Sequence, residues 1–475
     1  MSPKPTPPKD MLDWLGLSDT PDWRVARPLG PLFAAILITL FLSALCAAAA
    51  VLFRTITDSS AVSLGAGAMI TALLGAPFLI WGTIIKQKSL GFQKEGHITD
   101  RLSKAVEQLG AEKTVKKLNE DGQTVETSEP NIEVRIGGLL SLERIAQDST
   151  AYDKGRDHVR VMEILCAYVR ENSNAQDAKD SLRYRYEVEV FGGDYIDGEV
   201  TPQQTAQEFM DTHKLDDVSL SEKTTVCAQS RWAQSLPKPR TDIQQALDII
   251  GRRDTAKPED TVKLEKAAKY TLDLRGSNLQ AADMANGNWS HARLQAARME
   301  GAILRGARMK GADLREARME GANLDEARME GAGLIGARME GANLIGARME
   351  GANLDEARME GAILIGARME WANLDEARME GADLRGARMD ASTRLTAAVL
   401  RGAAVSSVDD ATITQLEPHL DDMFGDGSVD LPKGIPRPAH WPKWTLPWFG
   451  AHGFADEWRK WRDDPDGYTP PPKPE

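Results

Sequence analysis

A five-residue alternation of apolar and polar positions runs through the second half of the chain. Every fifth residue from Leu274 to Met389 is apolar, which gives 24 consecutive positions, and a small residue, usually Ala, lies two places before almost every one. A period of five matches neither the 3.6-residue repeat of an α-helix nor a long strand. The spacing instead predicts stacked coils of short flat segments, with a corner between one segment and the next. In each segment the apolar fifth residue, position i, and the small residue at position i−2 are expected to point inward.

These segments resemble a known repeat. Residues 312–316, with the sequence ADLRE, and residues 322–326, with the sequence ANLDE, are similar to the A-(D/N)-L-x-x unit of the pentapeptide-repeat family. The resemblance implies an all-β, right-handed quadrilateral β-helix with four pentapeptides per coil. Twenty-four pentapeptides would then form six coils, about 29 Å tall at ~4.8 Å between stacked strands.

A second period of ten residues separates Leu pentapeptides from Met pentapeptides. With four faces per coil, Leu is expected to stack on two opposite faces and Met on the other two. Met ladders can bind Cu(I), but thioethers also fill narrow interiors, and core packing is the favoured interpretation. The predicted core ladder comprises Leu304, Met309, Leu314, Met319, Leu324, Met329, Leu334, Met339, Leu344, Met349, Leu354, Met359, Leu364, Met369, Leu374, Met379, Leu384 and Met389.

Charged residues occupy the outward positions of the Met pentapeptides, where an Arg precedes and an acid follows each Met. Arg318 with Glu320 and Arg338 with Glu340 are examples. We expect a solvated network whose exposed pairs each contribute about 0–1 kcal/mol, so Arg338→Ala should have little effect. The net charge of residues 272–391 is only −4. Some relatives inhibit DNA gyrase by mimicking DNA, but this balance imitates a phosphate ladder poorly, and no nucleic-acid partner is expected.

The corners and one Leu face supply candidate contact residues. Gly ends most Met pentapeptides, as expected for corners that require an unusual φ. Trp371 replaces it once. Outward isoleucines form a candidate apolar strip for a partner or a second copy of the chain. The candidate partner surface is Ile303, Ile345, Ile363, Ile365 and Trp371.

The period slips by one residue after Met389, and the spacing of five resumes at Leu395. Residues 412–423 have a helical pattern and are expected to close the open end of the solenoid. Five of the 11 Trp residues follow in residues 441–461. We expect them to pack on the protein's own surface; docking at a membrane interface is the alternative.

Residues 89–260 read as a mostly α-helical linking domain. Asp-Gly at residues 121–122 predicts a hairpin turn, apolar spacing predicts helices over 100–109, 132–146 and 158–170, and Thr241 is expected to cap a helix over 242–251. Residues 181–200 favour β structure and predict an inserted hairpin. The helical segments also resemble the region that precedes the repeats in bacterial membrane-anchored pentapeptide-repeat proteins.

Two uncharged stretches near the N-terminus are long enough to cross a bilayer, which needs about 20 apolar residues. They predict a transmembrane helical hairpin over 28–88, with spans at about 28–53 and 60–85. Four Lys or Arg residues precede the first span, five follow the second and only Arg54 lies between them. This asymmetry places both termini in the cytoplasm of a multi-pass bacterial inner-membrane protein.

The resulting organisation is a tail (1–27), a membrane hairpin (28–88), a linking domain (89–260), a β-helix (270–405) and a C-terminal helix with a Trp/Pro-rich tail (406–475). Three widely separated Cys residues and scattered His residues give no metal or catalytic motif, and no cofactor is expected. The sequence predicts a non-catalytic, membrane-anchored interaction scaffold with an unidentified protein partner. A membrane sensor whose helical domain binds a ligand is the alternative, and a DNA-mimic modulator of a topoisomerase is a weaker one.

Overall fold

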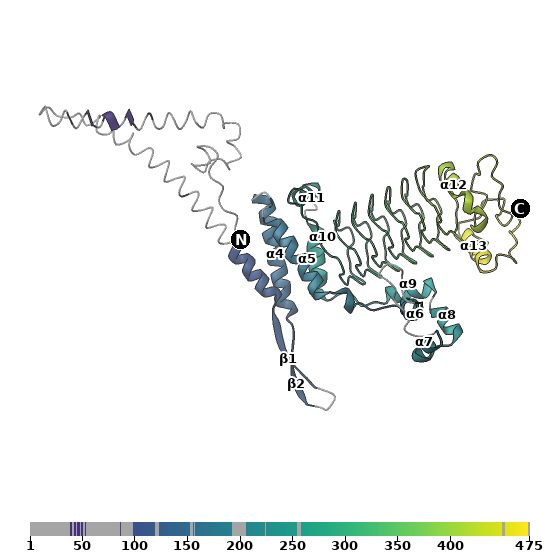
Figure 1. Cartoon of the computed structure of the whole chain (residues 1–475), viewed down its shortest axis with the longest axis horizontal. Coiled ribbons are helices and arrows are strands. Elements are labelled where there is room, and N and C mark those ends of the chain that lie inside the picture. The colour runs from purple at the N-terminus through teal and green to yellow at the C-terminus, as the bar shows by residue number, and fades with distance from the viewer. Residues whose placement is uncertain are drawn as a thin grey trace. The chain divides into compact units, whose positions relative to one another are not determined.

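The computed structural model describes residues 98–118, 123–152, 155, 157–191, 206–223, 225–253, 258–448 and 452–473, with isolated positions between 39 and 86. The chain divides into two units, Met1–Asp100 and Arg101–Glu475, and every helix and strand labelled in Figure 1 belongs to the second. The predicted spans at 28–53 and 60–85 lie almost entirely outside the described residues. Among the helices that are described, none combines the length and the apolarity needed to cross a membrane.

The first part of the second unit is a helical layer with a hairpin (Figure 1). Residues 101–109 are helical, and β1 (Glu112–Leu118) pairs antiparallel with β2 (Thr124–Pro130), which confirms the predicted hairpin. The helices α4 (Ile132–Tyr152), α5 (His158–Asn172) and α10 (Thr241–Arg252) pack on one another. The prediction that Thr241 caps this helix is wrong, because Thr241 is the first residue of α10. The N-cap position is Arg240, whose side chain makes no capping hydrogen bond.

The expectation of a β-hairpin over residues 181–200 is wrong for its described part. Residues 182–191 form α6 (Leu182–Phe191), and 192–205 lie outside the described residues. The alternating sequence RYRYEVEV suggested a strand, but its residues also repeat at i+4. Leu182, Tyr186 and Val190 pack on the cluster around Phe209 of α7 (Ala206–His213), while the i,i+4 ion pair Arg183–Glu187 supports the helix. Tertiary packing overrides the local β preference.

The remaining helices of the linking region are short. An η3 turn (Ala175–Asp177) precedes α6, and α8 (Asp217–Lys223) follows α7. The Thr225 hydroxyl accepts a hydrogen bond from the Ala228 N–H and so caps α9 (Val226–Gln234). Further along, α11 (Pro258–Ala267) is tied to α5 and α10 through buried Glu265, which lies 3.2 Å from His158 Nε2 and 3.0 Å from Arg253 Nε.

Residues 273–404 form a column of stacked coils. Parallel bridges join residue i to residue i+20 over most of its length, for example Arg298 to Arg318 and Arg318 to Arg338. Each coil therefore holds four pentapeptides. The segments are so short that they pair by isolated bridges, and the only multi-residue strands in the described part of the chain are β1 and β2. The chain as a whole therefore combines a repeat solenoid with helices, and the all-β expectation applies only to the column.

The interior of the column is a continuous apolar ladder. Ala at position i−2 and Leu or Met at position i are both buried throughout, while the corners turn outward. Corner glycines such as Gly301 and Gly341 have φ of 67° and 62°, a left-handed conformation that Gly adopts without steric cost. Trp371 takes the same conformation, with φ 62°.

Both open ends of the column are covered. At the first coil, the Asn288 N–H donates to the Gly251 carbonyl of α10 at 2.9 Å, and Gln244 exchanges two hydrogen bonds with the Asp283 backbone. At the last coils the bridge spacing becomes 21 residues, from Asp383 to Ala404, which confirms the predicted slip. α12 (Asp410–Leu416) and the η4 turn (Glu417–Asp422) lie beyond it. Covered ends remove the unpaired edges that would otherwise recruit other chains.

The Trp-rich tail packs on the column, as expected. Phe424, Leu446, Phe454 and Trp461 form one buried cluster with Ala404 of the last coil. The helix α13 (Phe454–Asp463) carries Trp458, whose Nε1–H donates to the Gly402 carbonyl at 2.8 Å. The tail is therefore a cap on the solenoid.

Candidate interaction surface

The two Met faces carry the same ion-pair ladder. On one face Glu320 lies 3.1 Å from Arg318 Nη2 of its own coil and 3.2 Å from Arg338 Nε of the next. On the opposite face Glu330 lies 3.3 Å from Arg328 Nε and 3.2 Å from Arg348 Nη2. Each carboxylate thus bridges two guanidinium groups, and the zigzag relieves the repulsion between like charges stacked along the column.

One of these faces is covered by other parts of the chain; we call it the covered Met face. It carries Arg298, Arg318, Arg338, Arg358 and Arg378 with Glu300, Glu320, Glu340, Glu360 and Glu380. The expectation of a solvated network is wrong here, because Glu300, Glu320 and Glu340 are fully buried. Sequence reasoning placed these charges outward correctly, but it did not identify the segment that covers them.

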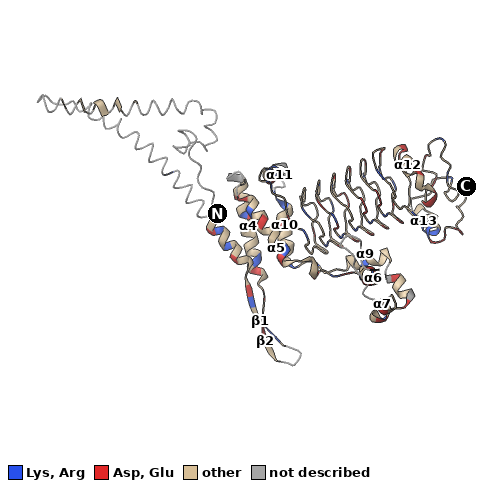
Figure 2. Cartoon of the chain, viewed as in Figure 1, with Lys and Arg blue, Asp and Glu red and all other residues tan. Residues whose placement is uncertain are grey.

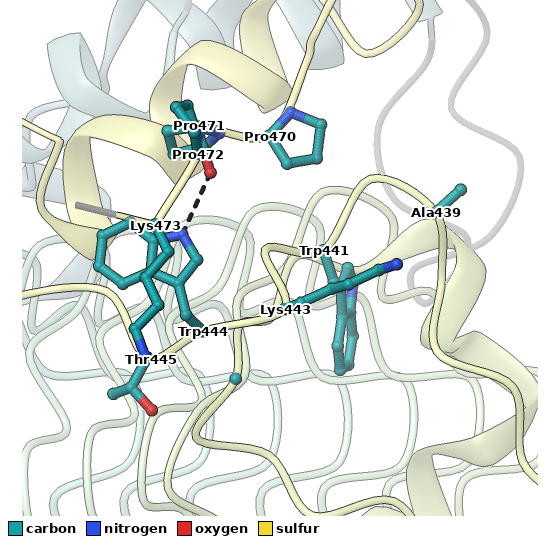
Figure 3. Close-up of a pocket in the computed structure, with 10 residues that line it drawn as sticks. Ala439, Trp441, Lys443, Trp444, Thr445, Pro470, Pro471, Pro472 and Lys473 are labelled. Carbon is teal, nitrogen blue, oxygen red and sulfur yellow. Dashed lines mark hydrogen bonds between the residues drawn. The ribbon is translucent and has the colours of Figure 1, made fainter. Parts of the chain in front are cut away.

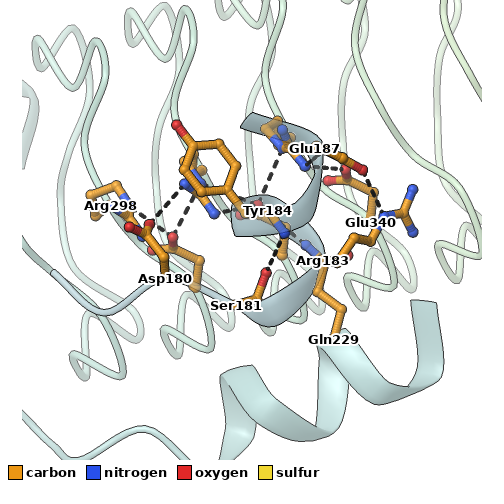
Figure 4. A network of polar contacts seen from close by, with 12 residues as sticks. Asp180, Ser181, Arg183, Tyr184, Glu187, Gln229, Arg298 and Glu340 are labelled. Carbon is orange, nitrogen blue, oxygen red and sulfur yellow. Dashed lines mark hydrogen bonds and ion pairs between the residues drawn. The ribbon is translucent and has the colours of Figure 1, made fainter. Parts of the chain in front are cut away.

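The covering segment is α6 and the residues just before it (Figure 4). Asp180 lies 2.8 Å from Arg298 Nη2 and Glu187 lies 2.9 Å from Arg338 Nη2. Between these acids, the Tyr184 ring stacks on the guanidinium of Arg318 with its centroid 3.5 Å from Cζ. Two acids and one aromatic ring therefore contact successive rungs of the Arg ladder.

The fit follows from two repeat distances. One turn of an α-helix rises about 5.4 Å, and stacked coils lie about 4.8 Å apart. A helix running along the column consequently brings one residue per turn to each coil. Tyr184 and Glu187 of α6 have this spacing, i and i+3, and Asp180, two residues before the helix begins, contacts the preceding coil.

A second helix, α9, follows the glycine corner beside the covered Met face. A Cβ atom at Gly301 would collide with the backbone carbonyl oxygen of Ala233, and one at Gly361 would lie 3.0 Å from Val226 Cγ1. Ser230 reaches the corner between them, where its hydroxyl donates to the Gly341 carbonyl at 3.4 Å. These corner glycines therefore permit both the left-handed turn and the close approach of α9.

The charges on the covered face are strongly coupled. Burial opposes ionisation of Glu187, but attraction to Arg338 and Arg358 outweighs it and lowers the pKa of Glu187 to about 2. Burial raises the pKa of Glu340 to about 7, against the attraction of Arg338 and with repulsion from Glu320. The helix is thus held by an ionised acid, while an acid of the ladder beneath it resists ionisation.

The opposite face, which we call the open Met face, carries Arg308, Arg328, Arg348, Arg368 and Arg388 with Lys310, Glu330, Glu350, Glu370 and Asp390. No described segment runs along its central coils. The Arg348 side chain keeps 40% of its surface exposed, whereas the Glu350 side chain keeps 12%. Guanidinium groups therefore form the outer layer of this face and carboxylates lie beneath them.

The predicted ladder residues and the predicted surface residues occupy different environments. All 18 ladder residues from Leu304 to Met389 lie inside the column with at most 1% of their surface exposed. Trp371 is 66% exposed, and Ile303, Ile345 and Ile363 are about one-third exposed on one Leu face. Ile365 is partly exposed on that face. The isoleucines do not form a continuous strip, because Asn323 and Asn343 separate Ile303 from Ile363 along the bridge column.

A cavity of about 710 Å³ lies in the C-terminal cap (Figure 3). Trp441 and Trp444 line it together with Pro470, Pro471 and Pro472, and the Trp444 Nε1–H donates to the Pro471 carbonyl at 3.1 Å. Its titratable lining groups are Lys443 and Lys473. Such a lining offers no acid–base pair, and within the described residues no group of His, Cys, Asp and Glu is arranged to hold a metal ion.

Basic and acidic residues are both spread along the whole column (Figure 2). The face-specific difference therefore comes from coverage, since both Met faces have the same pentapeptides. The candidate interaction surface therefore consists of the covered Met face with α6 bound to it and the open Met face.

Comparison with known proteins identifies the repeat. The family of pentapeptide repeats matches residues 273–311, 312–351 and 352–390, in eight copies. No curated protein matches the chain. Among solved structures, QnrB1, a plasmid-mediated fluoroquinolone resistance protein, is 17% identical over 30% of this chain and 74% of its own, with a TM-score of 0.24.

Two further solved structures are similar to part of the chain. HetL, a pentapeptide repeat protein involved in heterocyst differentiation regulation from the cyanobacterium Nostoc sp. strain PCC 7120, is 26% identical over 32% of this chain and 73% of its own, with a TM-score of 0.15. A pentapeptide repeat protein from the Arabidopsis thaliana thylakoid lumen is 26% identical over 25% of this chain and 77% of its own, with a TM-score of 0.12. The column of residues 273–390 is therefore built from the repeats of the pentapeptide-repeat family.

Proposed function

We propose that this protein is a non-catalytic scaffold whose pentapeptide column binds other proteins through its outer faces. The observation that carries the proposal is the docking of α6 and α9 along the covered Met face and its corner. Asp180, Tyr184 and Glu187 make specific contacts with four arginines of the ladder. The outer surface of the column is thus already a receptor for helices, used by the chain itself.

The proposal includes a location. The uncharged stretches at 28–53 and 60–85 support attachment to a bacterial inner membrane, with the column and both termini in the cytoplasm. Attachment would hold the column beside its partners. Reporter fusions at Glu475 test this topology, and a periplasmic signal would refute it.

Site-specific photo-crosslinking tests the scaffold function. A photoreactive amino acid would replace Ile345, Arg348 or Trp371, all exposed on the column, in the full chain at its native level in cells. We expect discrete adducts with another protein from at least one of these positions. Phe209, which is fully buried, is the control position and should give adducts only within the chain. If no exposed column position gives an intermolecular adduct, the scaffold function is refuted.

A further inference from the structure

We propose that the open Met face binds one α-helix of another protein that carries an aromatic residue and an acid three positions later, with a second acid four positions before the aromatic residue, just ahead of the helix. This inference rests on the proposed scaffold function and names the site and its partner. The chain's own α6 segment, with Asp180, Tyr184 and Glu187, is the template for the partner helix.

The first ground is the identity of the two ladders. The sequence ARME occupies residues 337–340 and 357–360 on the covered face and residues 347–350 and 367–370 on the open face. The ion pairs also match, since Arg358 Nε lies 3.1 Å from Glu340 and Arg368 Nε lies 3.1 Å from Glu350. The surface that binds the two acids and the aromatic ring of the α6 segment on one side of the column is therefore repeated on the other.

The second ground is charge complementarity. Arg328, Arg348 and Arg368 have side chains 40–49% exposed, whereas Glu330, Glu350 and Glu370 have side chains 12–16% exposed. The N–H groups that face outward are consequently those of guanidinium. They can donate to carboxylates in pairs and stack on an aromatic ring, as the covered face does.

The third ground is the corner beside the open face. Gly331 and Gly351 both have φ of 66°, and nothing lies within 4 Å of where their Cβ atoms would be. Trp371, 66% exposed, occupies the next corner position along the column. On the covered side the equivalent corner accommodates α9, so the open corner provides room for a helix and Trp371 provides an apolar contact at one end.

A helix fits this face better than an extended peptide or a nucleic acid. The helical pitch of about 5.4 Å nearly matches the coil spacing of about 4.8 Å, whereas the side chains on one face of a strand repeat about every 6.8 Å. The partly buried carboxylates between the arginines oppose a continuous phosphate backbone. The template segment instead places its two acids on either side of an aromatic ring, so a carboxylate does not have to face every coil.

The probe for the test is a fluorescent peptide of residues 179–191, stapled as a helix by a hydrocarbon link that replaces Leu182 and Tyr186. These two side chains pack on the Phe209 cluster, so the staple leaves Asp180, Tyr184 and Glu187, which contact the arginines, unchanged. Binding to the full chain is measured by fluorescence anisotropy. The control peptide carries Tyr184→Ala and Glu187→Lys.

We expect one peptide to bind per chain, and R348E with R368E to weaken its affinity about tenfold or more. The matched control variant is R315E, because Arg315 is similarly exposed on a Leu face. Both variants should still be folded at the temperature of the binding measurement, which thermal unfolding checks, and R348K with R368K should retain part of the binding.

Three results would overturn the inference: no binding of the peptide, binding that R348E with R368E does not change, or stronger binding of a DNA duplex to the same arginines. Loss of binding in R338A, measured at a temperature where this variant is still folded, would also overturn it, because the peptide would then be replacing α6 on the covered face. The scaffold function would survive these results if Ile345 or Trp371 still crosslinked to another protein.

Discussion

Glu187 of α6 and Arg358 of the column, 171 residues apart in sequence, form a two-point ion pair with both Arg Nη atoms 3.2 Å from the carboxylate oxygens. Arg338 Nη2 adds a third contact at 2.9 Å. Paired contacts of this kind fix direction as well as distance. The pairing fixes α6 along the covered Met face, and it makes that face differ from its counterpart across the column.

Replacing equivalent arginines on the two Met faces should have unequal effects. Arg338→Ala leaves buried Glu320 and Glu340 and partly exposed Glu187 short of a partner, and removing one member of a buried pair costs about 3–5 kcal/mol. Arg348→Ala removes an exposed contact worth about 0–1 kcal/mol. Thermal unfolding and limited proteolysis of α6 measure the difference. Equal tolerance would show that α6 is not held by the ladder.

Acid should release α6 from the column. The pKa of Glu187 is lowered from 4.5 to about 2, so the folded state binds fewer protons than the unfolded state between these values. Its stabilisation is complete above pH 4.5 and is lost as pH falls towards 2, by about 3 kcal/mol at most. Hydrogen exchange in α6 measures this release. In Glu187→Gln the pH dependence in this window should be reduced, and an unchanged profile would contradict the assignment.

Glycines with the same backbone conformation should differ in their tolerance of Ala. Gly301→Ala and Gly331→Ala both place a Cβ at positive φ, with a cost of roughly 1–2 kcal/mol. Only Gly301→Ala also drives that Cβ into the backbone of Ala233. We expect Gly301→Ala to displace α9, detected as faster proteolysis around residues 226–234. If both variants release α9 equally, the absence of a side chain at Gly301 is not what allows α9 to approach this corner.

The core ladder should tolerate a change of shape but not a charge. Met339 is fully buried, so Met339→Asp places an unpaired carboxyl group in the column and should destabilise it by several kcal/mol. Met339→Leu nearly preserves volume and should cost less than about 1.5 kcal/mol. Thermal unfolding followed by circular dichroism compares the two. Similar melting temperatures would argue against the inward position of Met339.

The cap at the C-terminal end should depend on buried rather than exposed Trp residues. Trp441 is 1% exposed and its Nε1–H donates to the Met423 carbonyl at 2.7 Å. Trp441→Ala should cost about 3–5 kcal/mol and expose the last coil. Trp448→Ala should cost only about 0.5–1 kcal/mol, because this half-exposed ring stacks on Arg385 at 4.4 Å. Hydrogen exchange at residues 398–405 distinguishes the two.

Local pattern was sufficient to predict the column but not its coverage. The spacing of five placed Leu304 and Met309 inward and Gly301 at a corner, because each pentapeptide repeats the same short-range constraints. The same decapeptide repeats cannot specify which Met face is covered. The interpretation of residues 181–191 failed for a related reason, because the contacts that favour a helix there, with the Phe209 cluster and with the Arg ladder, come from distant parts of the chain.

The sequence by itself determined the 20-residue coil, the Leu and Met ladders and the slip after Met389, since these depend on interactions between neighbouring residues and between residues one coil apart. Only the tertiary structure decided that Glu320 is buried and Glu330 is partly exposed. The physical reason is that coverage depends on docking of α6 and α9, whose contacts span more than 100 residues. Two chemically equivalent faces thereby become different surfaces.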